Sequence, residues 1–252
     1  MPKVSVTIIT KNEAADIGAA LDSVSWADER IVVDSCSTDE TVAIAARHGA
    51  RVVSREWPGY VAQKNHAASL AVNDWILSLD ADERVTPALA DEIRSTLEHQ
   101  PAARGFRIPR VTFHLGRWIR TTDWYPDYQL RLYDRREAEW TGKYVHEGVT
   151  VNGRVGRLRH ELQHYAYKDV AEHQETIEHY TTLAALQMFE HGRRASSLDL
   201  ALQPAFAFFR NYVLKRGFLD GSVGLTISKM NAEYVGMKFR KLRDLERLHA
   251  AR

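Results

Sequence analysis

Three acidic side chains follow an apolar run in the first third of the chain. Trp75 to Leu79 has the pattern of a short buried strand, and Asp80, Asp82 and Glu83 come directly after it. Carboxylates placed this close repel one another unless a cation lies between them. Two aspartates one residue apart can bind Mg²⁺ or Mn²⁺, which proteins often share with substrate phosphates. The alternative is a solvated turn, in which Glu83 is simply the acid before the next helix.

The elements that must position these acids alternate in type. Short β-branched or apolar runs predict strands over residues 3–10, 29–35, 50–56 and 74–80. Helical patterns lie between and after them, over residues 13–27, 37–49, 60–71 and 86–99. This alternation predicts βαβ units and a mostly parallel sheet covered by helices on both faces.

Helix-capping residues accompany two of the predicted helices. Ser37 or Thr38 is expected to cap the second helix through its hydroxyl. Thr86 is expected to cap the fourth, with Pro87 at its first position.

Polar clusters follow three of the predicted strands. Ligands bind parallel sheets at the carboxyl ends of the strands, so these clusters should converge on one site. They comprise Thr10, Asn12 and Glu13 after the first strand, Asp34 after the second, and Asp80 and Asp82 after the fourth. The chain has neither a GxxxxGK[ST] loop nor a GxGxxG turn. A phosphate-bearing ligand would therefore rely on a metal and on basic side chains.

The pattern changes after Pro101. Residues 101–168 are rich in aromatic residues and arginines and predict a mixed or antiparallel region, and residues 169–252 predict helices. Residues 204–221 combine aromatic side chains with Arg210, Lys215 and Arg216. Such an amphipathic basic segment can lie on an anionic membrane surface. It could equally pack against the catalytic domain or another subunit.

Composition narrows the function classes. A net charge of +1 argues against a broad electrostatic contact with nucleic acid. The single cysteine, Cys36, excludes an intramolecular disulfide. The N-terminus lacks the apolar core of a secretory signal, and no run approaches the ~20 apolar residues of a membrane-spanning helix. We expect a cytoplasmic protein, one that could still lie on the inner face of the cytoplasmic membrane.

Three segments of the first hundred residues resemble the signature segments of family 2 glycosyltransferases. They are VSVTIITKNEAADIGAALDSV, IVVDSCSTDETVAIA and WILSLDADERV, in the family's order and spacing. Three later segments resemble the bacterial branch that includes lipopolysaccharide core β-1,4-glucosyltransferases: WYPDYQLRLYDRREAEWTGKYVHEGV, LQHYAYKD and FFRNYVLKRGFLDG. The resemblance implies an α/β GT-A fold, Rossmann-like, with a mixed sheet and a helical C-terminal extension. It divides the chain into a catalytic domain over residues 1–168, whose residues 1–100 bind the nucleotide sugar, and an extension over residues 169–252.

The resemblance also implies roles for individual residues. Asp82 would bind the metal, Mg²⁺ or Mn²⁺, with His164 completing the site, and Asp80 would contact ribose or a metal-bound water. The remaining nucleotide-sugar residues would be Thr10, Asn12, Glu13, Asp34, Lys64 and Arg131, the last at the leaving diphosphate. The alternatives are an exposed helical lysine for Lys64 and a sheet-edge arginine for Arg131.

An inverting transfer needs a general base for the acceptor hydroxyl. The two candidates are Glu147, in VHEG, and Asp127, in YPDYQ. The family's usual base lies in an acidic pair, and this chain has His146 where the other acid would be expected. We favour Glu147, with Asp127 second or as an acceptor-binding residue. The alternative for Glu147 is an ion pair with a nearby arginine.

The resemblance thus implies a metal-dependent inverting glycosyltransferase. It would move a hexose, glucose by the branch resemblance, from a UDP-sugar to a lipid-linked lipopolysaccharide core oligosaccharide. Two alternatives stay open: the same donor chemistry on a protein or another glycan, and a nucleotide-sugar-binding module without turnover. The sequence leaves the oligomeric state open.

Overall fold

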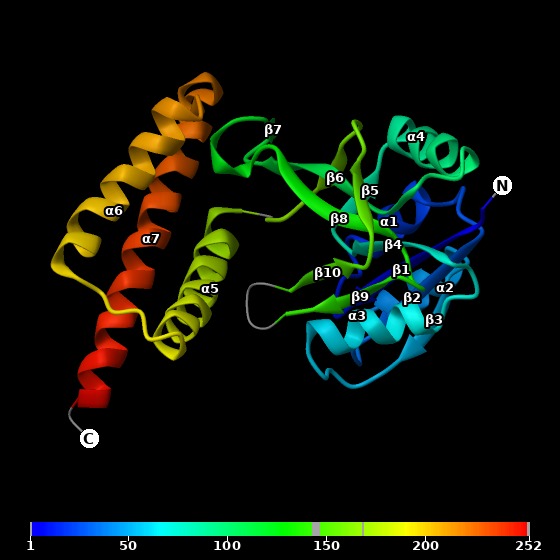
Figure 1. Ribbon diagram of the computed structural model, residues 1–252, viewed down its shortest axis with the longest axis horizontal. Coiled ribbons are helices and arrows are strands. Elements are labelled where there is room, and N and C mark those ends of the chain that lie inside the picture. The colour runs from blue at the N-terminus through cyan, green and yellow to red at the C-terminus, as the bar shows by residue number, and fades with distance from the viewer. Residues whose placement is uncertain (1, 143–146, 168, 251–252) are drawn as a thin grey trace. The chain divides into compact units, whose positions relative to one another are not determined.

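The computed structural model describes residues 2–142, 147–167 and 169–250 (Figure 1). The chain divides into two compact units. One comprises Met1–Val111 with Asp127–Tyr165, and the other comprises Thr112–Pro126 with Ala166–Arg252. The division expected from the sequence lies at residue 168 and stays a prediction.

The first unit opens with four parallel strands, β1 (Val4–Thr10), β2 (Glu29–Asp34), β3 (Arg51–Ser54) and β4 (Trp75–Asp80), in the order β3-β2-β1-β4. The helices between and after them are α1 (Ile17–Ser23), α2 (Thr41–Arg47), α3 (Tyr60–Ser69) and α4 (Pro87–Glu98). This is the predicted alternation, with shorter elements.

Beyond β4 the sheet becomes mixed. The antiparallel strand β8 (Asp127–Asp134) pairs with β4, and β6 (Ala103–His114) pairs with β8. The sheet then continues through β12 (Leu162–His164) to β5 (Glu83–Val85). Two more strands, β7 (Arg117–Ile119) and β11 (Arg154–Arg157), pair with β6, and β9 (Ala138–Thr141) forms a separate hairpin with β10 (Gly148–Val151). The sequence predicted no strand where β5 lies, only the residues that precede the next helix.

Alternate residues of the central strands face opposite sides, as the period of two requires. Ile8 and Leu77 belong to the core cluster that includes side chains of α1 and α4. Ile9 and Ile76 belong to the other cluster, with alanines of α3 and the region that follows it. Every residue of β1 is buried. Strand β4, which ends at the acidic turn, and its neighbour β1 are therefore packed on both faces.

The two capping expectations had different outcomes. Thr86 accepts a hydrogen bond from the Leu89 backbone N–H, with Pro87 at the first helical position, so that prediction is confirmed. The cap predicted at Ser37 or Thr38 is wrong, because α2 begins at Thr41. Ser37 instead donates from its backbone N–H and hydroxyl to the Asp34 carboxylate, which is buried and needs donors.

The second unit is mainly helical. It contains η1 (Thr122–Trp124), α5 (Val170–Glu190), α6 (Ser197–Phe209), η2 (Arg210–Leu214), η3 (Gly217–Asp220) and α7 (Gly221–Ala250). Both α5 and α6 pack against α7 around Ala185, Phe239 and Leu242. In the part of the chain that is described, no helix has the length and apolar character to span a bilayer.

The central strand β4 generates a stability prediction. Leu77 is fully buried, so Leu77→Ala should lower the free energy of unfolding by about 2–5 kcal/mol, through lost burial and the cavity it leaves. Leu248→Ala serves as the matched control, since Leu248 is exposed and should change the stability little. Urea unfolding measures both. Equal effects of the two substitutions would contradict the packing described for β4.

Candidate functional site

The polar ends of three strands lie side by side in the sheet. Register pairs Thr10 of β1 with Asp34 of β2, and Ile9 of β1 with Asp80 of β4. The chain leaves β1 for β2 and β3 on one side and adds β4 on the other. That reversal of strand order is where open α/β sheets bind ligands.

Hydrogen bonds join the loops that follow β1 and β2. The Asn12 side chain accepts from the Thr38 backbone N–H at 2.8 Å, and the Asn12 backbone N–H donates to Ser37 Oγ at 2.8 Å. The Glu13 backbone N–H donates to Thr41 Oγ1 at 2.8 Å. Asn12 has φ 57°, in the left-handed region. The expected nucleoside residues Asn12, Glu13 and Asp34 therefore belong to one cross-braced pair of loops.

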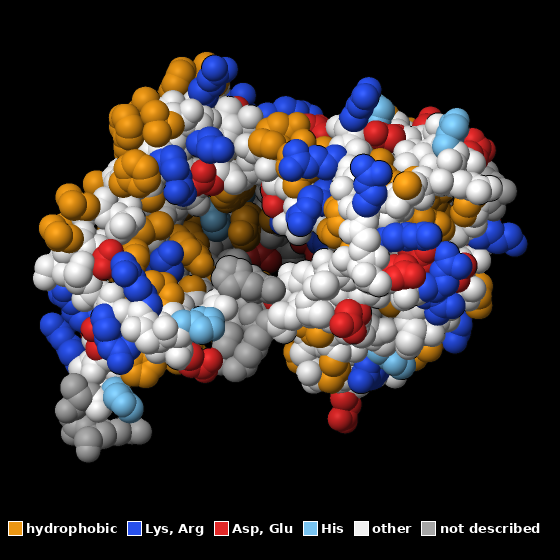
Figure 2. Space-filling view, viewed as in Figure 1, with side chains coloured by type: hydrophobic (Ala, Val, Ile, Leu, Met, Phe, Trp, Pro, Cys, Tyr) orange, Lys and Arg blue, Asp and Glu red, His pale blue; other side chains and the backbone are white. Residues whose placement is uncertain are grey.

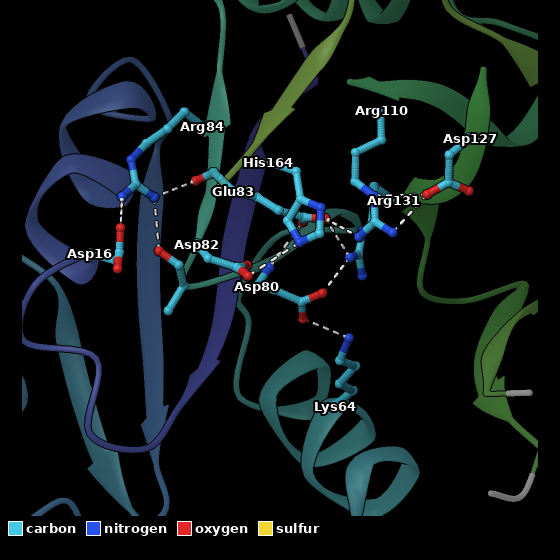
Figure 3. A network of polar contacts seen from close by, with 11 residues as sticks. Asp16, Lys64, Asp80, Asp82, Glu83, Arg84, Arg110, Asp127, Arg131 and His164 are labelled. Carbon is cyan, nitrogen blue, oxygen red and sulfur yellow. Dashed lines mark hydrogen bonds and ion pairs between the residues drawn. The ribbon is translucent and has the colours of Figure 1, made fainter. Parts of the chain in front are cut away.

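Asp80 lies between two buried cations (Figure 3). Its Oδ1 accepts from Lys64 Nζ at 2.8 Å, and its Oδ2 accepts from Arg131 Nη2. Lys64 is buried, so the alternative of an exposed helical lysine is wrong. Arg131 is buried in β8, between β4 and β6, so the alternative of a sheet-edge arginine is also wrong.

Glu83 is the counter-charge for two arginines. It is completely buried, and its Oε1 accepts from Arg131 Nη2 at 2.6 Å and from Arg110 Nη1 at 3.0 Å. Its Oε2 accepts from the Asp80 backbone N–H at 3.0 Å. The expectation that Glu83 is merely the acid before a helix is wrong. The buried guanidinium of Arg131 and the half-buried one of Arg110 need a carboxylate, and Glu83 supplies it from the start of β5.

The cations fix the charge state of this cluster. Burial alone would raise the pKa of Asp80, but the charges of Arg131 and Lys64 outweigh it and hold that pKa well below its usual range. Burial lowers the pKa of Lys64, and the Asp80 charge offsets part of that effect. The Lys64 ammonium also lies 4.4 Å from the centroid of the Trp140 ring. Asp80 is therefore an ionised carboxylate with both oxygens engaged.

Asp82 differs from its neighbours because no cationic side chain pairs with it in the described network. Its Oδ2 lies 3.2 Å from His164 Nε2. Its Oδ1 is buried and has no hydrogen-bond partner among the described residues. Backbone pairing brings His164 close to Asp82. His164 of β12 is in register with Glu83 of β5, and the Tyr165 N–H donates to the Asp82 carbonyl at 2.9 Å.

The charges around Asp82 otherwise cancel in the network of Figure 3. Lys64 and Arg131 face Asp80, Arg131 and Arg110 face Glu83, Arg110 faces Asp127, and Arg84 pairs with Asp16 at 2.8 Å. The labelled residues thus comprise five carboxylates and four permanent cations. The carboxylate left over is that of Asp82.

A divalent cation fits this donor set only with outside ligands. Asp82 and His164 offer a carboxylate and an imidazole, and the described residues contain no group of three His, Cys, Asp or Glu side chains able to hold a metal. Mg²⁺ and Mn²⁺ commonly keep water and bind substrate phosphates in addition to few protein ligands. The buried, unpartnered Asp82 oxygen agrees with such a shared site.

The two base candidates have different surroundings. Asp127 Oδ2 accepts from Arg110 Nε at 2.9 Å and Nη2 at 2.7 Å, and its Oδ1 accepts from Gln129 at 2.7 Å. Glu147 is half-buried and lies directly before β10. His146, noted in the sequence beside Glu147, lies outside the described residues.

Sequence reasoning missed Arg110 and misread Glu83. A signal was present, because both arginines interrupt apolar strands: Arg131 lies between Leu130 and Leu132, and Arg110 comes before Val111. A charge in a core strand needs an opposite charge nearby. Pairing it with Glu83 required the position of β5, which the sequence did not predict.

Residues 5–152 match the model of the family described as "Glycosyl transferase family 2". The chain belongs to glycosyl transferase family 2. It is 34% identical to an uncharacterized glycosyltransferase of Rickettsia felis over 97% of this chain and 90% of the relative. It is 29% identical to the lipopolysaccharide core biosynthesis glycosyltransferase LpsC of Rhizobium meliloti, over 98% of this chain and 94% of that protein.

Solved structures show the same fold. The mannosyltransferase PcManGT from Pyrobaculum calidifontis, in complex with GDP-Man and Mn²⁺, superposes with a TM-score of 0.58 at 16% identity, covering 96% of this chain and 88% of that one. Glucosyl-3-phosphoglycerate synthase from Mycobacterium tuberculosis, in complex with Mn²⁺, UDP and glucosyl-3-phosphoglycerate, superposes with a TM-score of 0.53 at 20% identity, covering 77% and 82%. The predicted GT-A fold and the predicted enzyme class, an inverting family 2 glycosyltransferase, are confirmed.

The buried network generates a second stability prediction. Glu83→Gln removes the charge that faces Arg131 and Arg110, so the free energy of unfolding should fall by about 3 kcal/mol. Asp91→Asn is the control, because Asp91 forms an exposed pair with Arg94 that is worth at most about 1 kcal/mol. Urea unfolding of both variants checks the prediction. Equal stability of the two would mean that Glu83 is not the required counter-charge.

Proposed function

We propose that this enzyme transfers a hexose, glucose, from a UDP-sugar to a lipid-linked lipopolysaccharide core oligosaccharide, with inversion and with a divalent metal. The main support for a metal-dependent donor site is the uncompensated Asp82 carboxylate, which lies beside His164 at the ends of the parallel strands. The similarity to LpsC supports the acceptor class. A protein or another glycan as acceptor is the alternative.

Asp82 and His164 would hold Mg²⁺ or Mn²⁺, and imidazole favours Mn²⁺. When bound, the cation supplies electrostatic stabilisation of the negative charge that builds on the leaving diphosphate. Asp80 would stay on the ribose side, since its oxygens are already held by Lys64 and Arg131. Those two cations keep Asp80 from repelling a diphosphate, and Arg131 is our candidate for contact with it.

The nucleoside would bind at the ends of β1 and β2. Asn12, Glu13 and Asp34 belong to the two loops that hydrogen bonds join, and Thr10 is paired with Asp34 across the strands. Thr10 Oγ1 is buried without a hydrogen-bond partner among the described residues. Buried polar atoms normally have a partner, and a ligand group could supply one here.

The acceptor hydroxyl would give its proton to Glu147 as its oxygen attacks the anomeric carbon opposite the leaving nucleotide. Asp127 is less suited, because Arg110 holds one of its oxygens and Gln129 the other. A proton arriving there would displace existing bonds. Asp127 would instead hold Arg110 in place or contact the acceptor.

The first prediction from this proposal concerns the metal. Asp82→Ala should lower turnover of a UDP-hexose with Mn²⁺ at least about 100-fold, because the cation supplies several kcal/mol of charge stabilisation. The assay measures UDP release across a panel of UDP-sugars, with Asp91→Ala as the control on an exposed acid. Undiminished turnover in Asp82→Ala would overturn the metal assignment. Nucleotide binding by the parent without turnover of any donor would count against the proposed activity.

The second prediction separates the base candidates. Glu147→Gln should lower kcat by about 10²- to 10⁴-fold with little change in UDP binding, since a general base acts in the transition state. Asp127→Asn should have the smaller effect on kcat. The measurement is steady-state kinetics together with UDP titration of each variant. A larger loss of kcat in Asp127→Asn would reverse the assignment.

A further inference from the structure

The outer face of α6 and the turns after it carries an unusual row of exposed apolar side chains. Figure 2 shows apolar side chains gathered over the region where Figure 1 places α6. Leu198, Leu202, Phe206 and Phe209 are spaced at four, four and three residues, so they share one side of α6, and the exposed Val213 of η2 follows four residues later. Phe206 is 53% exposed and Leu198 is 68% exposed. Contiguous exposed apolar surface of this kind marks a contact surface.

This row is distinct from the face that α6 uses in the core. Ala207 and Asn211 are buried on the opposite side, where α6 packs against α7. The Asn231 side chain of α7 donates to Asn211 Oδ1 at 2.8 Å. The exposed row is therefore not needed to hold α6 on the second unit.

The apolar surface continues past the end of α6. Tyr212 stacks on Phe208 and meets the edge of Phe218, with ring centroids 5.5 and 6.3 Å apart. Phe218 and Leu219 of η3 are exposed. We call the exposed side chains of Leu198, Leu202, Phe206, Phe209, Val213, Leu214, Phe218 and Leu219 the outer apolar face.

The exposed charged side chains of the same segment are all positive. Between Arg194 and Leu219 the chain has a single acid, Asp199, which is buried and bonded to Ser196 and Arg193. Lys215 and Arg216 are exposed, and within the described residues they form no ion pair. The outer apolar face is thus accompanied by free cations without an exposed carboxylate.

We propose that the outer apolar face binds an anionic lipid bilayer at its interface. Apolar side chains would enter the headgroup–acyl boundary while Lys215 and Arg216 contact anionic headgroups. A second copy of the chain fits less well, because a two-fold contact would bring this surface and its cations onto themselves. This inference rests on the proposed function in one respect: membrane binding would hold the enzyme where a lipid-linked acceptor is found.

Vesicle co-sedimentation of the full chain tests the proposal without any sugar. The parent should sediment with vesicles of phosphatidylcholine and phosphatidylglycerol and much less with phosphatidylcholine alone. Phe206→Ser with Phe209→Ser should weaken binding at least about tenfold, and Lys215→Gln about fivefold. Val72→Ser and Arg47→Gln are the matched controls, an exposed apolar residue and an exposed cation of the first unit, and should bind as the parent does. Circular dichroism checks that each variant is folded.

Three results would overturn the membrane assignment. The first is that the parent binds neither kind of vesicle, and the second is that the parent and the Phe206/Phe209 variant bind equally well. The third is that the parent is a dimer and the same variant is a monomer, with no change in vesicle binding. UDP release from a UDP-sugar in solution, measured without vesicles, should be unchanged in the variants. Because vesicle binding and UDP release are measured separately, failure of this inference is distinguishable from failure of the proposed activity.

Discussion

The structure depends on neutralising acidic side chains that lie against buried strands. Asp80, Glu83 and Asp127 are matched by Lys64, Arg110 and Arg131, each acid lying within hydrogen-bonding distance of a cation. Burying any one of these groups without its partners would be costly, so the set is retained or lost together. The balance has a consequence for its neighbour. Because the lysine and arginines of this network are committed elsewhere, Asp82 has only the His164 imidazole beside it among the residues of Figure 3, and its charge is available to an added cation.

The network also explains how the sheet positions a site. Its members come from α3, β4, β5, β6 and β8, which are spread over residues 60–134. The buried Glu83 carboxylate accepts a hydrogen bond from the Asp80 N–H, and this bond fixes the turn that contains Asp82. The backbone bond from Tyr165 holds the same turn from β12 and brings His164 to Asp82. A preorganised carboxylate of this kind costs little rearrangement when a metal–diphosphate arrives.

Much of this arrangement could be predicted from the sequence, and the remainder had physical reasons for escaping prediction. The alternating strands and helices, the Thr86 cap and the convergence of Thr10, Asp34 and Asp80 follow from local patterns. The burial of Lys64 and the role of Glu83 do not, because both depend on partners many residues away. The Ser37 cap failed for a local reason, since the Asp34 carboxylate three residues earlier takes its donors and α2 begins only at Thr41. Local rules give the strand ends, and tertiary charge pairing decides which acid stays free.

The central claim is that Asp82 is left uncompensated for a cation shared with a nucleotide diphosphate. Isothermal titration of UDP into the parent protein, with and without Mn²⁺, tests it most directly. The account predicts that UDP binds at least about tenfold more tightly with Mn²⁺, and that by linkage Mn²⁺ binds more tightly in the presence of UDP by the same factor. UDP affinity that is unchanged by Mn²⁺ would contradict the account.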